Sequence, residues 1–354
     1  MKKMLLTILI LIFIVSCKTN SYIGEKQKKT VFESVQIDTL FQDKISIRAI
    51  LVNENKVWYA ANNGRFGFFD LEKNKKSENQ INKDSLKPEF RSIAKTDNHV
   101  FMLSVSNPAL LYQVSKEGLF PKLVYQENHK KVFYDSMQFW NNKEGIAIGD
   151  PIEGCLSMII TRDGGNSWSK IPSGVLPKVA DGEAAFAASN TNIVIKGNST
   201  WIVSGGIKSR VFYSPDKGNS WKVSATPIVQ GKQMTGIFTA DFYDSKNGFI
   251  AGGDYEVPNQ NFANKACTTD GGKTWNLVAE NQGFGYASCV QYVPESNGKR
   301  IVSVGASGLY YSADSGNSWK QFSTDSSLYT IRFLDNHTAV AAGKNKMIRI
   351  HFKK

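Results

Sequence analysis

The stretch Thr161-Arg-Asp-Gly-Gly-Asn-Ser-Trp168 decides the fold, because close copies of it recur further along the chain. All copies share the pattern Ser/Thr-x-Asp-x-Gly-x-Ser/Thr-Trp. The aspartates of successive copies are 53, 54 and 44 residues apart, and repeats of roughly 40–50 residues are typical of the blades of a β-propeller. The other three copies are Ser214-Pro-Asp-Lys-Gly-Asn-Ser-Trp221, Thr268-Thr-Asp-Gly-Gly-Lys-Thr-Trp275 and Ser312-Ala-Asp-Ser-Gly-Asn-Ser-Trp319.

The residue types of this repeat are those of a tight turn that leads into a strand. The aspartate can accept hydrogen bonds from backbone N–H groups just downstream. The glycine supplies the positive φ of the turn, and the tryptophan can fill the space between neighbouring sheets. Identical turns spread around a ring cannot converge on one substrate, so we interpret these residues as structural and expect no metal site. They are Asp163, Trp168, Asp216, Trp221, Asp270, Trp275, Asp314 and Trp319.

The repeat resembles the Asp-box, or BNR, repeat. Over residues 31–354 the chain is most similar to the propeller family of the photosystem II stability/assembly factor and its bacterial relatives, and sialidases share the same box. The resemblance implies an all-β propeller that docks protein or cofactor-bearing partners. Such a box is specific for the fold and says little about function.

The number of strand-rich segments predicts seven blades. These segments begin near residues 46, 90, 135, 184, 237, 286 and 329. The last segment offers only three strands, near residues 330–334, 338–342 and 347–352, whereas residues 31–41 alternate like a lone strand. We therefore expect a seven-bladed β-propeller in which this N-terminal strand completes the last blade and removes free edges.

The N-terminus has the pattern of an export signal. Two lysines precede an apolar run over residues 4–15, which is too short to span a bilayer. The string Ile14-Val15-Ser16-Cys17 resembles a bacterial lipobox, which implies a signal peptide over residues 1–16 and lipidation of Cys17, with palmitate as one acyl group. Residues 17–30 then form a flexible tether. We expect an anchor in the cell envelope, at the outer membrane because Lys18 rather than Asp follows the cysteine; the alternative is a plain secretory signal.

Composition narrows the classes of partner. The formal net charge is +12, which favours either plain solubility or attraction to acidic partners such as a protein or an acidic glycan. No nucleic-acid motif, nicotinamide fingerprint, P-loop or GxSxG elbow is present. The four histidines are scattered, and no CxxC spacing occurs. We expect no cofactor, no metal and no nucleic acid, and a monomer.

A ligand site is expected at the end of the ring away from the boxes, because the boxes join the two outer strands of a blade. One interpretation is recognition of an anion by arginine forks. The other is that arginine and aspartate neutralise each other and hold the blades in register, with Gly149-Asp150 and Gly253-Asp254 being only turns. The residues 253–264 form a longer insertion of the kind that often carries function. The candidate ligand-binding residues are Arg48, Arg91, Asp150, Asp254 and Arg332.

Two classes of function remain open. The first is a non-catalytic, envelope-anchored propeller of the assembly or scaffold type, which binds a protein or an anionic ligand. The second is a sialidase-like or other glycoside hydrolase acting on acidic glycans, although the Arg-Ile-Pro motif of sialidases is absent. A hydrolase needs two carboxyl groups at roughly 5–10 Å. The candidates for such a pair are Asp135, Asp150, Glu183, Asp241 and Asp254.

Overall fold

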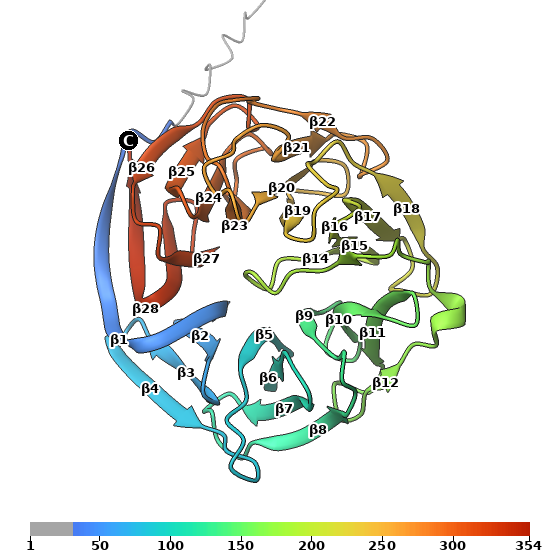
Figure 1. The fold of residues 1–354 in the computed structure, drawn as a ribbon. Helices are drawn as coiled ribbons and strands as arrows, with labels where there is room; N and C mark the ends of the chain where they lie inside the picture. The colour runs from blue at the N-terminus through green and yellow to red at the C-terminus, as the bar shows by residue number, and fades with distance from the viewer. Residues whose placement is uncertain (1–30) are drawn as a thin grey trace, which may run out of the picture. The chain divides into compact units, whose positions relative to one another are not determined.

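The computed structural model describes residues 31–354, which form an all-β fold whose sheets are arranged in a ring (Figure 1). The signal peptide, Cys17 and the tether predicted for residues 1–30 lie outside the described residues. Within the described part, the strands are interrupted by one short 3-10 helix, Ser173–Val175. No helix in that part is long and apolar enough to cross a membrane.

All paired strands of the described chain are antiparallel. Four sheets hold four strands each. One comprises β5 (Phe90–Lys95), β6 (His99–Ser104), β7 (Ala109–Ser115) and β8 (Lys122–Glu127), and the next comprises β9 (Tyr134–Phe139), β10 (Gly145–Ile152), β11 (Cys155–Thr161) and β12 (Ser169–Lys170). The other two comprise β14 (Ile193–Lys196), β15 (Ser199–Val203), β17 (Arg210–Ser214) and β18 (Lys222–Ala225), and β23 (Ala287–Tyr292), β24 (Ile301–Gly305), β25 (Gly308–Ser312) and β26 (Lys320–Ser323).

Two further sheets hold six strands each. The first has the order β27 (Leu328–Phe333), β28 (Thr338–Lys353), β1 (Ser34–Asn53), β2 (Lys56–Ala61), β3 (Arg65–Asp70) and β4 (Lys75–Gln80). The second has the order β13 (Glu183–Ala184), β16 (Gly205–Gly206), β19 (Thr235–Phe242), β20 (Gly248–Asp254), β21 (Lys265–Thr268) and β22 (Asn276–Leu277).

The prediction of seven blades is wrong, because the strands form six hydrogen-bonded sheets. The physical reason is the continuity of β1, which is 20 residues long. Its first half pairs with β28 and its second half pairs with β2, so strands assigned from the sequence to the first and last blades join one sheet. The separate strands expected at 338–342 and 347–352 are likewise one strand, β28.

The two ends of the described chain pair with each other, as the alternation of residues 31–41 predicts. Ser34 faces Lys353 in an antiparallel register. Just before this strand, Phe32 is 1% exposed. Its ring lies 5.1 Å from that of Tyr311 and 5.0 Å from that of Phe352. Both backbone pairing and apolar packing therefore hold the N-terminal strand against the C-terminal one.

The hydrophobic core lies between neighbouring sheets, where Phe101 of β6 meets Phe139 of β9 at 4.9 Å and Trp201 of β15 stacks on Phe242 of β19 at 4.0 Å. Two box tryptophans join these clusters from the same sheet as Phe139 and Phe242. Trp168 packs edge-on against Phe139, with ring centroids 5.6 Å apart. Trp275 meets Phe242 in the same way at 6.0 Å. Such edge-to-face pairs contribute about 0.5–1.5 kcal/mol beyond the burial of their area.

Each of the four boxes forms a turn, and the same hydrogen bonds recur in all four. In the first, the Asp163 carboxylate accepts bonds from the Ser167 N–H at 3.0 Å and the Ser167 hydroxyl at 2.6 Å. The Thr161 hydroxyl donates to the same carboxylate at 2.8 Å. Gly165 has a φ of 83°, and a Cβ there would lie 2.3 Å from the Phe101 ring. The other three boxes repeat the bonds to the aspartate carboxylate.

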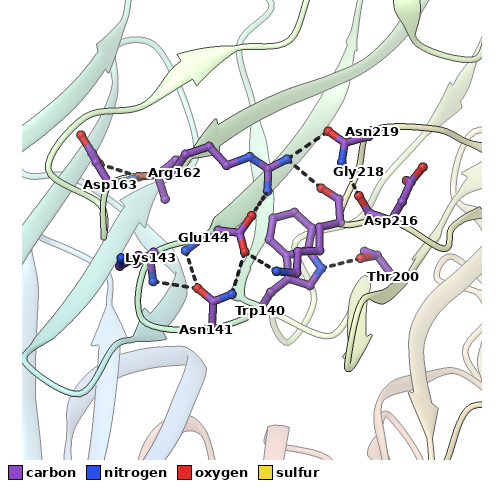
Figure 2. A network of polar contacts seen from close by, with 12 residues as sticks. Trp140, Asn141, Lys143, Glu144, Arg162, Asp163, Thr200, Asp216, Gly218 and Asn219 are labelled. Carbon is purple, nitrogen blue, oxygen red and sulfur yellow. Dashed lines mark hydrogen bonds and ion pairs between the residues drawn. The ribbon is translucent and has the colours of Figure 1, made fainter.

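Neighbouring boxes are joined by a polar network (Figure 2). Glu144 accepts a hydrogen bond from Arg162 at 2.8 Å and forms an ion pair with Lys217. Arg162 also donates to the Lys217 carbonyl at 3.0 Å. Arg162 occupies the second position of one box and Lys217 the fourth position of the next. The variable positions of the repeat therefore tie β11 to the turn that follows β17.

Candidate functional site

A segment of the chain reaches into the middle of the ring. It comprises residues 185–192, between β13 and β14, and Figure 1 shows the chain before β14 extending towards the centre. The Asn190 side chain donates to the Ile93 carbonyl at 2.8 Å and accepts from the Met137 N–H at 2.9 Å. We call these eight residues the crossing segment.

The crossing segment is also bound to the strands on the other side of the ring. The Ser189 hydroxyl donates to the Ser288 carbonyl at 2.5 Å, and the Thr191 hydroxyl donates to that of Thr239 at 2.8 Å. Its hydrogen-bond partners thus come from six strands, namely β1, β5, β9, β19, β23 and β27. The segment therefore fills the centre of the ring and separates its two ends.

The two ends of the ring differ in which part of the inner strands they present. The box turns lie where the inner strands finish, since the Gly164 N–H in the first box donates to the Lys143 carbonyl just after β9. At the other end the inner strands begin, and two cavities of about 370 and 330 Å³ lie there. Arg48, Tyr255 and Tyr286 line both cavities. We call the larger one the first cavity and the smaller one the second cavity.

Arg48 is half-buried in the wall that the two cavities share. Its guanidinium lies 4.2 Å from the centre of the Tyr329 ring and donates one hydrogen bond, at 3.3 Å, to the Ala188 carbonyl. No carboxylate of the described residues lies within ion-pair distance of it. A guanidinium offers five N–H donors, so most of the donors of Arg48 are available to a ligand.

Arg91 also lines the first cavity, but it is already neutralised. Its guanidinium forms an ion pair with Glu89 at 2.6 Å and a second contact with the same carboxylate at 2.8 Å. Glu89 is 43% exposed, so solvent screens this pair. Arg91 therefore contributes less uncompensated charge to the cavity than Arg48 does.

Asp150 lines the first cavity from the end of β10. Its carboxylate accepts one hydrogen bond, at 3.1 Å, from the Ala185 N–H of the crossing segment. Burial raises the pKa of Asp150 to about 6, because the charged form loses hydration that this single bond does not replace. At neutral pH the group is still ionised.

Asp135, on β9, is a neighbour of Asp150 and is fully buried. Neither of its carboxyl oxygens has a hydrogen-bond partner among the described residues. Burial raises the pKa of Asp135 well above its ordinary value, and the nearby charge of Asp150 raises it further. Burial and the neighbouring carboxylate therefore favour the protonated form of Asp135.

An aromatic wall lines the first cavity together with Asp150 and Arg48. The Phe186 and Phe238 rings stack in parallel, 3.9 Å apart. Tyr286 meets Phe238 edge-on at 4.8 Å, and Tyr255 meets Tyr286 edge-on at 5.2 Å. Tyr255 belongs to the insertion 253–264 and is 47% exposed, so it lies at the rim. The cavity therefore offers flat apolar surface between groups of opposite charge.

The structure brings three of the five predicted ligand-binding residues together: Arg48, Arg91 and Asp150 all line the first cavity. Asp254 does not join them. It is 1% exposed, and its carboxylate accepts the N–H groups of Glu256 at 2.9 Å and Val257 at 3.2 Å. Asp254 thus fixes the turn that begins the insertion, which corresponds to the structural interpretation of Gly253-Asp254.

Arg332 lies towards the other end of the ring. It lines a separate cavity of about 420 Å³ together with Lys196 and Asp241. Its guanidinium donates to the Ile331 carbonyl at 2.7 Å and to the Ser189 carbonyl at 3.2 Å. These bonds fasten the crossing segment, so the inner-strand position of Arg332 did not predict its surroundings.

The described residues offer no group of three or more His, Cys, Asp or Glu side chains that could hold a metal ion. Cys155, Cys267 and Cys289 are free thiols. Glu183, one of the carboxyls considered for a hydrolase, is held by Arg210 at 2.9 Å and by the Ser204 hydroxyl at 2.6 Å. It therefore stabilises the loop before the crossing segment.

Sequence reasoning missed the crossing segment and half of the aromatic wall. Tyr255 and Tyr286 fall in turns expected at the ligand end of the ring, whereas Phe186 and Phe238 each read as ordinary core residues in a strand-rich segment. The run Ala184-Ala-Phe-Ala-Ala-Ser189 reads as the start of an inner strand, yet only its first residue is in β13. Its small side chains are the one local signal that the backbone approaches other strands closely.

The ring of antiparallel sheets and its cavity-bearing end define the protein as a β-propeller. Neither a family model nor any curated protein matches its sequence. Among solved structures, it is similar to YCF48 bound to D1 peptide, with a TM-score of 0.63, 12% identity, and coverage of 92% of this chain and 98% of that one. It is also similar to YCF48 from Cyanidioschyzon merolae, with a TM-score of 0.64, 10% identity, and coverage of 91% and 99%.

The similarity extends to propellers with enzymatic activity. A GH74 enzyme from Niastella koreensis matches with a TM-score of 0.62 and 13% identity, over 88% of this chain and 53% of that one. At these identities the likeness shows the fold alone, and the function has to be argued from the residues at the cavity.

Proposed function

We propose that this chain is a non-catalytic β-propeller of the cell envelope that binds a protein or an anionic ligand through the end of the ring where the inner strands begin. The observation that carries the proposal is Arg48, a half-buried cation shared by two cavities with no carboxylate partner among the described residues. A charge removed from water without a partner is costly. Binding of a carboxylate or phosphate would offset that cost.

The fold is compatible with such a role. YCF48, a propeller of similar size and arrangement, has been solved with a D1 peptide. That finding concerns YCF48, and it supports for this chain only that a ring of this kind can receive a peptide. Arg48 supplies the specific argument, because its planar donors match a carboxylate.

We further propose that lipidation of Cys17 anchors the propeller in the envelope, at the outer membrane. Residues 17–30 then serve as the tether. The measurement is incorporation of radioactive palmitate followed by membrane fractionation. Label that survives in a Cys17→Ser variant, or a wild-type chain released into the soluble fraction, contradicts the anchor.

The alternative function, a glycoside hydrolase, is supported by the likeness to GH74 enzymes and by the raised pKa of Asp150. Hydrolysis requires two carboxyl groups that face the sugar. Asp150 lines the first cavity, whereas its neighbour Asp135 is 0% exposed. The pair therefore suits binding better than double contact with a substrate. Turnover of sialyl or uronic-acid glycans by the purified chain, lost in Asp150→Ala, would establish the hydrolase instead.

The binding proposal is tested by removing the two arginines. A short N-acetylated peptide with a free C-terminal carboxylate, carrying a fluorescent label, serves as the anionic probe in anisotropy titrations. Loss of a charge-assisted hydrogen bond costs about 1.5–3 kcal/mol, so Arg48→Ala with Arg91→Ala should weaken binding at least tenfold. Arg162→Ala, on the box side of the ring, is the matched control and should leave the affinity unchanged. Equal binding by the double variant and the wild type would show that these arginines are structural.

A further inference from the structure

The first cavity contains two opposite charges, each without its partner. Arg48 has no carboxylate within ion-pair distance. Asp150 has no lysine or arginine within that distance, and the same holds for Asp135. No such partner is present among residues 31–354, which supply every lining residue of the cavity. Burial makes an unpaired charge costly, so such groups are paired in most proteins or wait for a ligand.

Besides Arg48, no positively charged side chain of the cavity wall is free to neutralise Asp150. Arg91 is the one other cation in the wall, and Glu89 already holds it at 2.6 Å. Asp150 takes a single N–H, from Ala185, and Asp135 takes none. A fully buried carboxyl group with both oxygens unbonded is rare in native structures. Asp135 lies behind the cavity wall, so the carboxylate open to a ligand is that of Asp150, which has room for further donors beside the single Ala185 N–H.

The surface between the charges is apolar and flat. Phe186 and Phe238 stack at 3.9 Å, with Tyr255 and Tyr286 completing the wall. Aromatic faces carry partial negative charge and attract cations, whereas their area binds apolar groups. A ligand seated here would thus place a short apolar body on these rings and a charge at either side.

We propose that the first cavity binds a zwitterionic ligand, an α-amino acid or short peptide with both termini free, whose ammonium group contacts Asp150 and whose carboxylate contacts Arg48. This inference rests on the proposed function, because it keeps Arg48 as the anion-binding group. It adds a second requirement, a cation in the same ligand. The cavity volume of about 370 Å³ lies within the range of small-molecule sites.

The requirement for both charges is tested with three forms of one dipeptide. Ala-Phe with free termini, N-acetyl-Ala-Phe and Ala-Phe amide are titrated calorimetrically into the purified full chain at pH 7.5. The free dipeptide should bind at least tenfold more tightly than either blocked form. The comparison needs only the wild-type protein, so it is independent of the folding of any variant.

Two substitutions then assign the charges to residues. Asp150→Asn should weaken the free dipeptide about tenfold and leave the N-acetylated form unchanged. Arg48→Gln should weaken the free dipeptide and leave the amide unchanged. Asp241→Asn and Lys196→Gln line the cavity at the other end of the ring and are the matched controls. They should alter neither affinity.

The outcomes separate this inference from the proposed function. If N-acetyl-Ala-Phe binds as tightly as the free dipeptide and Arg48→Gln weakens both, the cation requirement is overturned while anion binding stands. If the amide binds as tightly as the free dipeptide, the role of Arg48 is overturned and both proposals fall. If the free dipeptide shows no binding at millimolar concentration, the zwitterion site is overturned, and the anionic probe still decides the proposed function.

Discussion

At the scale of the residue, neighbouring side chains decide which acidic groups are strained and which are satisfied. Asp150 lies at a cavity with one hydrogen bond, and its pKa is raised to about 6 by burial. Asp270 lies in a box turn, and its pKa is lowered to about 2, chiefly by the hydrogen bond from the Thr274 hydroxyl. The two groups therefore have opposite effects on stability as the pH changes.

The strain at Asp150 predicts a pH-dependent stabilisation by Asp150→Asn. Between about pH 4 and pH 6 the folded chain binds the proton more tightly than the unfolded chain, so the contribution of Asp150 is favourable at low pH and is lost as the pH rises through 6. The neutral variant escapes this loss, and it should be more stable than the wild type by up to about 3 kcal/mol at pH 8. Urea unfolding at pH 8 and pH 4 measures the difference. An equal difference at both pH values would contradict the assignment.

The position of a residue within a repeat indicates its location better than its contacts. Arg48 and Arg91 each precede an equivalent inner-strand residue, Ile50 and Ile93, by two positions, and both line the first cavity. Asp254 and Arg332 were also predicted from their positions, but Asp254 stabilises a turn and Arg332 binds the crossing segment. A position in a repeat fixes which way a strand residue is placed, whereas the bonds it makes depend on segments far away in the sequence.

At the scale of the element, the box turn is set by its own eight residues. Asp163, Ser167 and Thr161 satisfy one another without help from distant segments. That is why the turn could be predicted from the sequence alone. The crossing segment is the opposite case, because its conformation is held chiefly by hydrogen bonds to six separate strands.

The box turn yields a prediction for Asp270→Asn, where the amide can replace only part of the carboxylate's acceptors. We expect a loss of about 1–2 kcal/mol at pH 7. The lowered pKa means that the stability due to Asp270 is present above about pH 4 and is lost as the pH falls through 2, so the difference between variant and wild type should shrink in acid. Denaturant unfolding at pH 7 and pH 3 measures this. The exposed Asp181→Asn is the control, and a loss equal to that of Asp270→Asn would refute a specific role for the box.

At the scale of the whole molecule, closure of the ring depends on the pairing of β1 with β28. The pairing was predictable, because the last segment of the sequence lacked a strand and the first offered one. The number of sheets was not. The register between β1 and β28 is interrupted between Gln42 and Ser46, yet the backbone continues as one strand into its pairing with β2. In the sequence, such an interruption breaks the strand pattern and therefore indicates a boundary between two strands.

The closure predicts a large effect of Phe32→Ala. The side chain is 1% exposed and packs on Tyr311 and Phe352, so its truncation leaves a cavity and should cost about 3–5 kcal/mol. Val31→Ala is the matched control, because Val31 is 43% exposed and should lose little. Equilibrium unfolding in urea measures both. A Phe32→Ala chain as stable as the control would mean that the packing of Phe32 adds nothing to the closure.

The crossing segment also gives the propeller a hub. In a ring without such a segment, each sheet is held only by its two neighbours, so one weak interface between sheets can let a sheet move away from the ring. Here backbone and side-chain bonds from β1, β5, β9, β19, β23 and β27 converge on residues 188–191, like spokes on an axle. If the interface between two neighbouring sheets opens, these inner strands therefore remain attached to the centre of the ring.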